Sequence, residues 1–401
     1  MNKNKDILLD ILEKNWEPEQ IYNMFPNPSP WKNEIEQEKT GYCWLITELH
    51  ALMYFMSKKY GTKDIYFSLT DLIVFDKVEK ANCFFEKVYK TRRLPTTNEE
   101  VTYILTNAMS DRGHWEMSVN LIKKYGLVPI EKKECEKNNL RTGEINAVLA
   151  FLMRYYASII RDREKVKKIN DFLQIKEIAM KKIKEILYTY IKKPKEKIQI
   201  PDYIKKKEKS WISPKEFYDR YVCFPFDDYA CFFVGANEQD SVIKVSLKSL
   251  GNIYENGSLT FWKISSDVMY NGIYKQLQQG DTCWIGLDGG KFLFRDSGIY
   301  DDSVFNIKEI LGYDVQLNSE MISLYRMAKT THSMLLFDMA SGECGKWWRA
   351  QNNVENYETH NENFFISDSW LKKYVFIAVL NKKNINMDVF KHVFLEPWKI
   401  L

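Results

Sequence analysis

Residues 36–61 read EQEKTGYCWLITELHALMYFMSKKYG, and this stretch decides how the rest of the chain is interpreted. Its apolar residues recur at helical spacing, at Leu45, Leu49, Leu52, Met53 and Met56. Lys58, Lys59 and Gly61 then supply the basic last turn and the glycine that are typical of a helix C-terminus. The pattern therefore predicts a buried helix that begins close to Cys43.

Cys43 has two interpretations at the start of such a helix. A single cysteine is most often a small buried hydrophobic residue. A helix N-terminus, however, presents unpaired N–H groups and a positive dipole end, which stabilise a thiolate. Gln37 lies six residues upstream and can direct an amide N–H toward the sulfur.

The neighbours of Cys43 favour the reactive interpretation. Gly41-Tyr42-Cys43-Trp44 has the Gly-x-Cys-Trp form of a papain-type nucleophile. A thiolate nucleophile also needs a histidine and a group that orients that histidine. The remainder of the chain is expected to supply both.

The size and composition of the chain limit the classes of protein to consider. The 401 residues predict two or three subdomains, and 45% hydrophobic residues are enough for globular cores. The 58 basic and 54 acidic residues nearly balance, which does not indicate a nucleic-acid-binding protein as a whole. Seven cysteines without CxxC pairs indicate a reducing compartment. With no signal-peptide pattern and no long apolar run, a cytoplasmic protein without a membrane span or a cofactor is expected.

The periodicity changes along the chain and predicts three parts. Residues 1–135 are predicted to be mainly helical and to carry the nucleophile. Residues 136–212 combine a long charged helical pattern with the lysine-rich loop KKPKEKIQIPDYIKKKEKS. Residues 213–401 alternate in the manner of strands, as in TCWIGLD, HSMLLFDMA, GKWWRAQNN and YVFIAVL. The predicted class is α+β.

Among the five histidines, His332 is the best candidate for the general base. His50 lies two helical turns beyond Cys43, about 10 Å along the helix axis, which is too far. His332 begins a predicted strand, and Asn352 follows at the end of the next one. Two adjacent antiparallel strands would place the asparagine beside the imidazole, where its carbonyl can accept the ring N–H.

These motifs resemble the bleomycin hydrolase / aminopeptidase C family of papain-like cysteine peptidases. The resemblance covers nearly the whole chain and includes the cysteine stretch, WEMSVNLIKKYGLVP, KTTHSMLLFDM and GKWWRAQNN. It implies a two-lobe papain-like fold, with a helical lobe, a β-barrel-like lobe and an inserted helical and hook-like subdomain. The insertion explains the 289 positions between Cys43 and His332, since simple papain-like enzymes use about 130–150.

The resemblance also assigns roles to individual residues. It implies Cys43 as nucleophile, His332 as general base and acid, Asn352 as the residue that orients His332, and Gln37 as an oxyanion donor. The substrate-binding residues that it implies are Gly113, His114, Trp115 and the terminal carboxylate of Leu401. It further implies peptide substrates, no metal or cofactor, and a homohexamer with the active sites facing an inner channel.

Departures from the family pattern leave the mode of cleavage open. Arg112 replaces the first of two glycines in the substrate-binding loop, and Asn353-Val354-Glu355 replaces Ser-Trp-Gly after Asn352. The chain also stops at Leu401, several residues short of the family tail. An aminopeptidase is the leading hypothesis and an oligopeptide endopeptidase is the second. A weakly catalytic assembly that binds nucleic acid through Lys192–Lys209 is the third, although a solvated lysine-rich surface explains that loop more simply.

Overall fold

The chain forms two compact units in the computed structural model, which describes residues 16–29, 40–134, 140–204, 210–235, 242–303, 311–313, 315–351 and 363–399. The helical unit contains Glu34–Phe224, Val245–Thr260 and Val393–Leu401. The sheet unit contains Met1–Asn33, Pro225–Lys244 and Phe261–His392. The mixed α+β class predicted from the sequence is confirmed.

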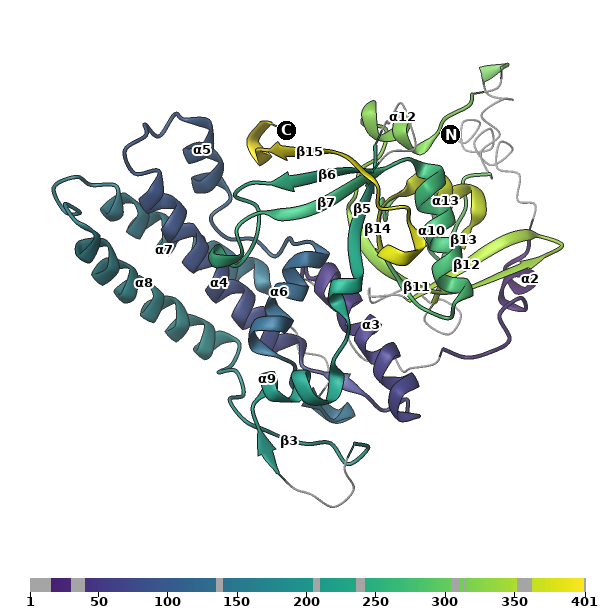
Figure 1. Cartoon of the computed structure of the whole chain (residues 1–401), viewed down its shortest axis with the longest axis horizontal. Helices are drawn as coiled ribbons and strands as arrows, with labels where there is room; N and C mark the ends of the chain where they lie inside the picture. The colour runs from purple at the N-terminus through teal and green to yellow at the C-terminus, as the bar shows by residue number, and fades with distance from the viewer. Residues whose placement is uncertain are drawn as a thin grey trace, which may run out of the picture. The chain divides into compact units, whose positions relative to one another are not determined.

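Long helices dominate the helical unit (Figure 1). They are α3 (Cys43–Tyr60), α4 (Leu69–Lys90), α6 (Trp115–Tyr125), α7 (Thr142–Ile160) and α8 (Ile169–Tyr190), and the shorter helices α5 (Glu99–Thr106) and α9 (Pro214–Phe217) accompany them. Two short antiparallel pairs accompany them, β1 (Tyr66–Phe67) with β2 (Pro129–Ile130) and β3 (Ile198–Gln199) with β4 (Trp211–Ile212). The lysine-rich loop predicted from the sequence therefore contains a strand.

Helix α3 has the boundaries and the core face that its sequence predicts. Its five apolar positions, from Leu45 to Met56, are all fully buried. It ends at Gly61, whose φ of 66° lies in the left-handed region, where glycine is preferred because it has no Cβ. The apolar positions explain why the helix is buried and Gly61 explains where it ends, and Cys43 is its first residue.

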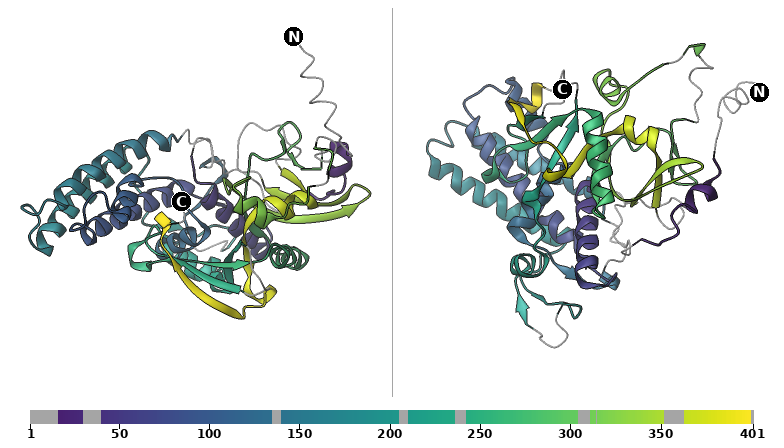
Figure 2. Two further views of the ribbon diagram at one scale, coloured as in Figure 1. Left: turned by 90° about the horizontal axis from the view of Figure 1, so that it is seen from above. Right: turned by 45° about the vertical axis from the view of Figure 1, so that its right-hand side comes forward.

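Helices α4, α7 and α8 pack around one apolar core. Phe84 and Phe85 of α4 meet Leu149 and Met153 of α7 there, and Phe172 of α8 joins them. Helices α7 and α8 run side by side in Figure 1 and in both views of Figure 2. The helical character predicted for residues 136–192 is thus found in two helices of this unit.

A mixed sheet forms the sheet unit. Its strands are β5 (Tyr229–Val234), β8 (Cys283–Leu287), β9 (Leu293–Phe294), β10 (Ile299–Tyr300), β11 (His332–Gly342), β12 (Gly345–Gln351), β13 (Asn363–Ser367) and β14 (Val375–Asn381). Their order is β5-β14-β8-β11-β12-β13-β10-β9. Strands β7 (Leu259–Ile264), β6 (Val242–Leu247) and β15 (Val389–Leu395) continue this order beyond β5, and each includes residues of both units.

Helices α10 (Ser266–Gln278) and α13 (Asp368–Tyr374) contribute to the core of the sheet unit, and α2 (Pro18–Tyr22) and α12 (Ser319–Leu324) are its other described α-helices. The core contains Ile285 of β8, Met334 of β11 and Trp348 of β12, together with Trp370 of α13. Strand β11 lies between β8 and β12 and is antiparallel to both. This pairing confirms the antiparallel arrangement predicted for the two strands that carry the histidine and the asparagine segment.

Candidate active site

Cys43 is the first residue of α3 and is half-buried. Tyr42 precedes it as the N-cap, and the Tyr42 carbonyl accepts the N–H groups of Leu45 and Ile46, both at 3.0 Å. The Tyr42 side chain is fully buried, and its hydroxyl donates to Asp76 Oδ2 at 3.0 Å. The residue before the cysteine is therefore held from both its backbone and its side chain.

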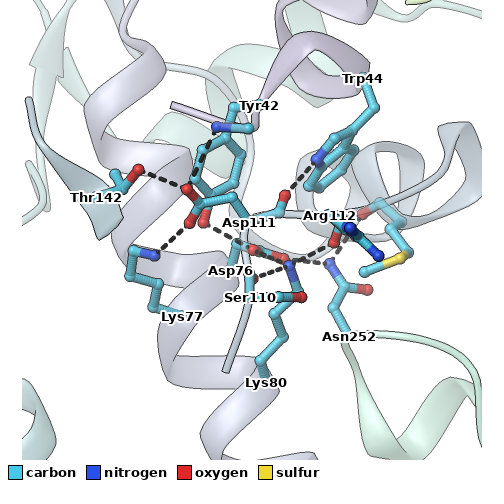
Figure 3. A network of polar contacts seen from close by, with 12 residues as sticks. Tyr42, Trp44, Asp76, Lys77, Lys80, Ser110, Asp111, Arg112, Thr142 and Asn252 are labelled. Atoms are coloured by element: carbon cyan, nitrogen blue, oxygen red, sulfur yellow. Dashed lines mark hydrogen bonds and ion pairs between the residues drawn. The ribbon is translucent and has the colours of Figure 1, made fainter. Parts of the chain in front are cut away.

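Asp111 contacts the residues on both sides of this position (Figure 3). The N–H of Gly41 donates to Asp111 Oδ2 at 3.3 Å, and the indole Nε1–H of Trp44 donates to the Asp111 carbonyl at 2.8 Å. Because Cys43 lies between Gly41 and Trp44, these two bonds fix the turn that presents the sulfur.

Asp111 is held in turn by α4 and α7. Its Oδ1 forms an ion pair with Lys77 Nζ at 2.8 Å and accepts the Asn146 amide N–H at 2.8 Å, while Oδ2 accepts the Thr142 hydroxyl. Burial alone would raise the pKa of Asp111, but the Lys77 charge and these hydrogen bonds hold it below its ordinary value. Asp111 therefore remains a carboxylate that joins three helices.

Lys80 supports the same loop from α4. Its Nζ forms an ion pair with Asp76 Oδ2 at 2.7 Å and donates to the carbonyls of Ser110 and Arg112, each at 2.9 Å. Asn252 donates to Asp76 Oδ1 at 3.1 Å. These bonds hold the 110–113 loop through its backbone carbonyl groups. The Arg112 side chain is exposed.

Gly113 and His114 follow on this loop. A Cβ added at Gly113 would lie 2.3 Å from Cε2 of Trp44, so the indole ring leaves room only for glycine. His114 is the N-cap of α6, and burial, helped by the Lys80 charge, lowers its pKa to about 4. His114 is therefore neutral at pH 7.

Trp115, which follows the 110–114 loop, forms a side-chain hydrogen bond with Glu48. Trp115 is the first residue of α6 and is buried, and its indole hydrogen-bonds the Glu48 carboxyl group. Glu48 of α3 is only 1% exposed, and burial raises its pKa to about 8 although the Trp115 bond acts in the opposite direction. Glu48 is thus mostly protonated at neutral pH.

His332 begins β11 in the sheet unit, as predicted. It pairs with Leu287 of β8, and a Cβ at Gly289 would lie 2.9 Å from the His332 Cβ. Burial lowers the pKa of His332 to about 4, so the ring is neutral at pH 7. Its Nε2 is buried and has no hydrogen-bond partner within the described part of the chain.

The predicted site residues fall into three groups. Cys43, Gly113, His114 and Trp115 belong to the helical unit, where Gly113 adjoins the residue after Cys43. His332 belongs to the sheet unit. Gln37, Asn352 and Leu401 lie outside the described residues. Strand β12 is described up to Gln351, which pairs with Leu335 of β11.

The sequence motifs do not point to three residues of this region, namely Lys77, Glu48 and the anchoring residue Asp111. A charged residue on an apolar helix face could have indicated them. Lys77 lies among the buried residues of α4, and Glu48 lies among those of α3. A charge in such a position requires a partner inside the protein, although the pattern does not reveal which one.

Residues 2–401 match the Peptidase C1-like family. The chain belongs to this family. It is 26% identical to aminopeptidase C of Listeria monocytogenes over 90% of this chain and 84% of that protein. It is 25% identical to bleomycin hydrolase of Gallus gallus, over 92% and 84% of the two chains. The predicted family is confirmed.

A solved structure supports the fold of this Peptidase C1-like protein. The crystal structure of PepW from Lactobacillus rhamnosis HN001 superposes with a TM-score of 0.80 at 23% identity, covering 98% of this chain and 93% of that one. The papain-like fold predicted from the sequence is therefore confirmed, and family membership makes the chain a cysteine-type peptidase. Within the described ranges, no helix is long and apolar enough to cross a membrane.

Proposed function

We propose that this chain is an aminopeptidase that releases N-terminal residues through a Cys43–His332–Asn352 site. The observation that carries this proposal is the half-buried Cys43 at the first position of α3 in a peptidase-family chain. Relatives named aminopeptidase C and aminopeptidase G, at 26% and 24% identity, support the exopeptidase activity.

The proposed chemistry is acyl transfer. Neutral His332 accepts the Cys43 proton, and the thiolate attacks the carbonyl carbon of the scissile bond. The Cys43 N–H and the Gln37 amide stabilise the oxyanion. His332 then gives its proton to the leaving amine as the C–N bond breaks, and later activates the water that hydrolyses the thioester.

Asn352 is proposed to orient His332. The His332 Nε2 is buried without a described partner, and Asn352 directly follows Gln351, the last described residue of β12. An amide carbonyl that accepts the ring N–H would remove the cost of burying an unpaired polar atom.

Peptides with free and blocked N-termini test the aminopeptidase proposal. We expect turnover of a free-amino fluorogenic peptide and little turnover of its N-acetylated form. Efficient cleavage of the blocked peptide would instead assign endopeptidase activity. Cys43→Ser and His332→Ala are expected to abolish turnover and to slow labelling of residue 43 by an epoxide inhibitor. Lys181→Ala, at an exposed position of α8, serves as a control in which Cys43 and His332 are both intact.

A homohexamer and a cytoplasmic location complete the proposal. An exposed apolar stripe on α7 supports association, since Val148, Phe151 and Tyr155 are 52%, 75% and 55% exposed. None of the described cysteines forms a disulfide bond, which fits a reducing compartment.

A nucleic-acid partner receives less support from the lysine-rich loop. Lys192, Lys193 and Lys195 form ion pairs with Asp71, Glu196 and Glu134, respectively. These carboxylates reduce the positive charge that a phosphate backbone would meet.

A further inference from the structure

A cavity of about 310 Å³ lies behind the 110–114 loop in the helical unit. Gly113 and His114 line it on one side, and Gly113 also abuts the Trp44 ring next to Cys43. The cavity therefore adjoins the loop to which substrate binding is assigned, and the following inference rests on the proposed function.

The floor of the cavity is apolar. Cys83 and Phe84 of α4 line it together with Ile104 of α5 and Met117 of α6, and all four side chains are buried. Such a floor can receive the methylene groups of an amino-acid side chain.

The charged side chains that line the cavity are all basic. Lys80, Lys87 and Arg112 line the cavity, and none of the lining residues is an aspartate or a glutamate. The Lys80 charge is largely compensated by Asp76 at 2.7 Å. Lys87 donates at 2.7 Å to the neutral carbonyl of Ser249 and also hydrogen-bonds the Cys83 thiol. Arg112 is exposed and forms no side-chain hydrogen bond or ion pair with any described residue.

We infer that this cavity selects an acidic side chain of the peptide substrate, with Arg112 and Lys87 as the cations that attract its carboxylate. A glutamate matches both features, because its methylene groups suit the apolar floor and its carboxylate suits the cations. Arg112 is the residue of the 110–114 loop at which the sequence departs from the pattern that the resemblance implies, so this selectivity would depend on a residue of this chain.

A peptide series tests the inference in the full-length protein. A neutral free-amino peptide receives a single Glu, Gln or Lys at each position in turn, and kcat/KM is measured for each peptide. At one position we expect Glu to exceed Gln by about threefold to tenfold and Lys to be the poorest. The Glu/Gln ratio should approach one in 0.5 M NaCl, since salt screens exposed charges.

Variants then connect the selectivity with the cavity. Arg112→Gln should bring the Glu/Gln ratio close to one, and Arg112→Glu should favour Lys over Glu. Arg163→Gln removes an exposed arginine of the same unit from outside the cavity lining and should preserve the wild-type ratio.

Two results would overturn the inference: no position at which Glu exceeds Gln, or a ratio that Arg112→Gln leaves unchanged. In both cases cleavage of the neutral peptides would keep the proposed function intact. If the protein cleaves none of the peptides, both the proposed function and this inference are overturned.

Discussion

At the scale of single residues, Glu48 gives the protein a pH dependence opposite to that of an ordinary carboxylate. Its pKa of about 8 in the folded protein exceeds the ordinary value of 4.5. Between these values the unfolded chain loses a proton that the folded protein keeps, so stability falls as pH rises. Glu48→Gln removes this titration while its carbonyl can still accept the Trp115 indole N–H.

We therefore expect Glu48→Gln to gain stability relative to wild type as pH rises from 5 to 8, by at most about 1.4 kcal/mol per pH unit. Urea unfolding at several pH values measures this difference. Glu144→Gln, at an exposed position of α7, is the matched control and should show no such trend. A constant difference between Glu48→Gln and wild type would contradict the prediction.

Gly113 supports a second prediction at this scale. In Gly113→Ala the new methyl group would overlap the Trp44 ring, so either the ring or the loop must move. Displacement of the residue after the nucleophile by about 1 Å can cost about 100-fold in rate. We expect a loss of kcat/KM of at least tenfold.

Gly143→Ala separates this effect from a general response to alanine. A Cβ at Gly143 meets no atom within 4 Å, and alanine favours the helix α7 in which Gly143 lies. This variant should keep wild-type kcat/KM. Equal activity of both alanine variants would show that Trp44 tolerates the methyl group.

At the scale of elements, Asp111 links the start of α3 to α4 and α7. In Asp111→Asn the fully buried Lys77 side chain loses its carboxylate partner. Removal of one member of a buried ion pair typically costs about 3–5 kcal/mol. We expect a loss of this size in the free energy of unfolding, accompanied by lower turnover because Gly41 and Trp44 lose a fixed anchor.

Two further variants make this prediction specific. Asp219→Asn breaks the exposed pair with Lys215 and should cost less than about 1 kcal/mol. Adding Lys77→Met to Asp111→Asn removes the unpaired charge and should recover part of the lost stability. A double variant as unstable as the sum of the single ones would exclude this ion pair as the cause.

The sequence predicts where helices and strands lie along the chain better than it predicts which elements pack against each other. Helix α3 was predictable because its apolar spacing and Gly61 are local signals. Helix α7 carries two apolar stripes, and its sequence does not indicate which one faces the core. Leu149, Met153 and Ile160 of one stripe are buried, whereas Val148 and Tyr155 of the other stripe are exposed.

The same limit applies to the candidate site. Cys43 and His332 are predicted as site residues because motifs fix a residue type at a recognisable position. The ion pair between Lys77 and Asp111 joins residues 34 positions apart, and the Trp115–Glu48 bond joins two helices. Only tertiary packing determines such partners, so periodicity and local motifs cannot identify them.

At the scale of the whole molecule, the exposed stripe on α7 leads to the last prediction. Burial of Phe151 and Tyr155 against another copy would remove apolar surface from water, which stabilises the contact by about 25 cal/mol per Å².

The proposed hexamer predicts a mass in sedimentation several times the 47.7 kDa of one chain. Phe151→Asp with Tyr155→Asp would place two charges in the buried contact and should shift the protein toward smaller species. Gln278→Glu, an exposed position of α10, adds a charge elsewhere and should leave the mass unchanged. A wild-type protein that sediments as a single chain would exclude this role for α7, since the stripe would then be exposed to solvent in the native state.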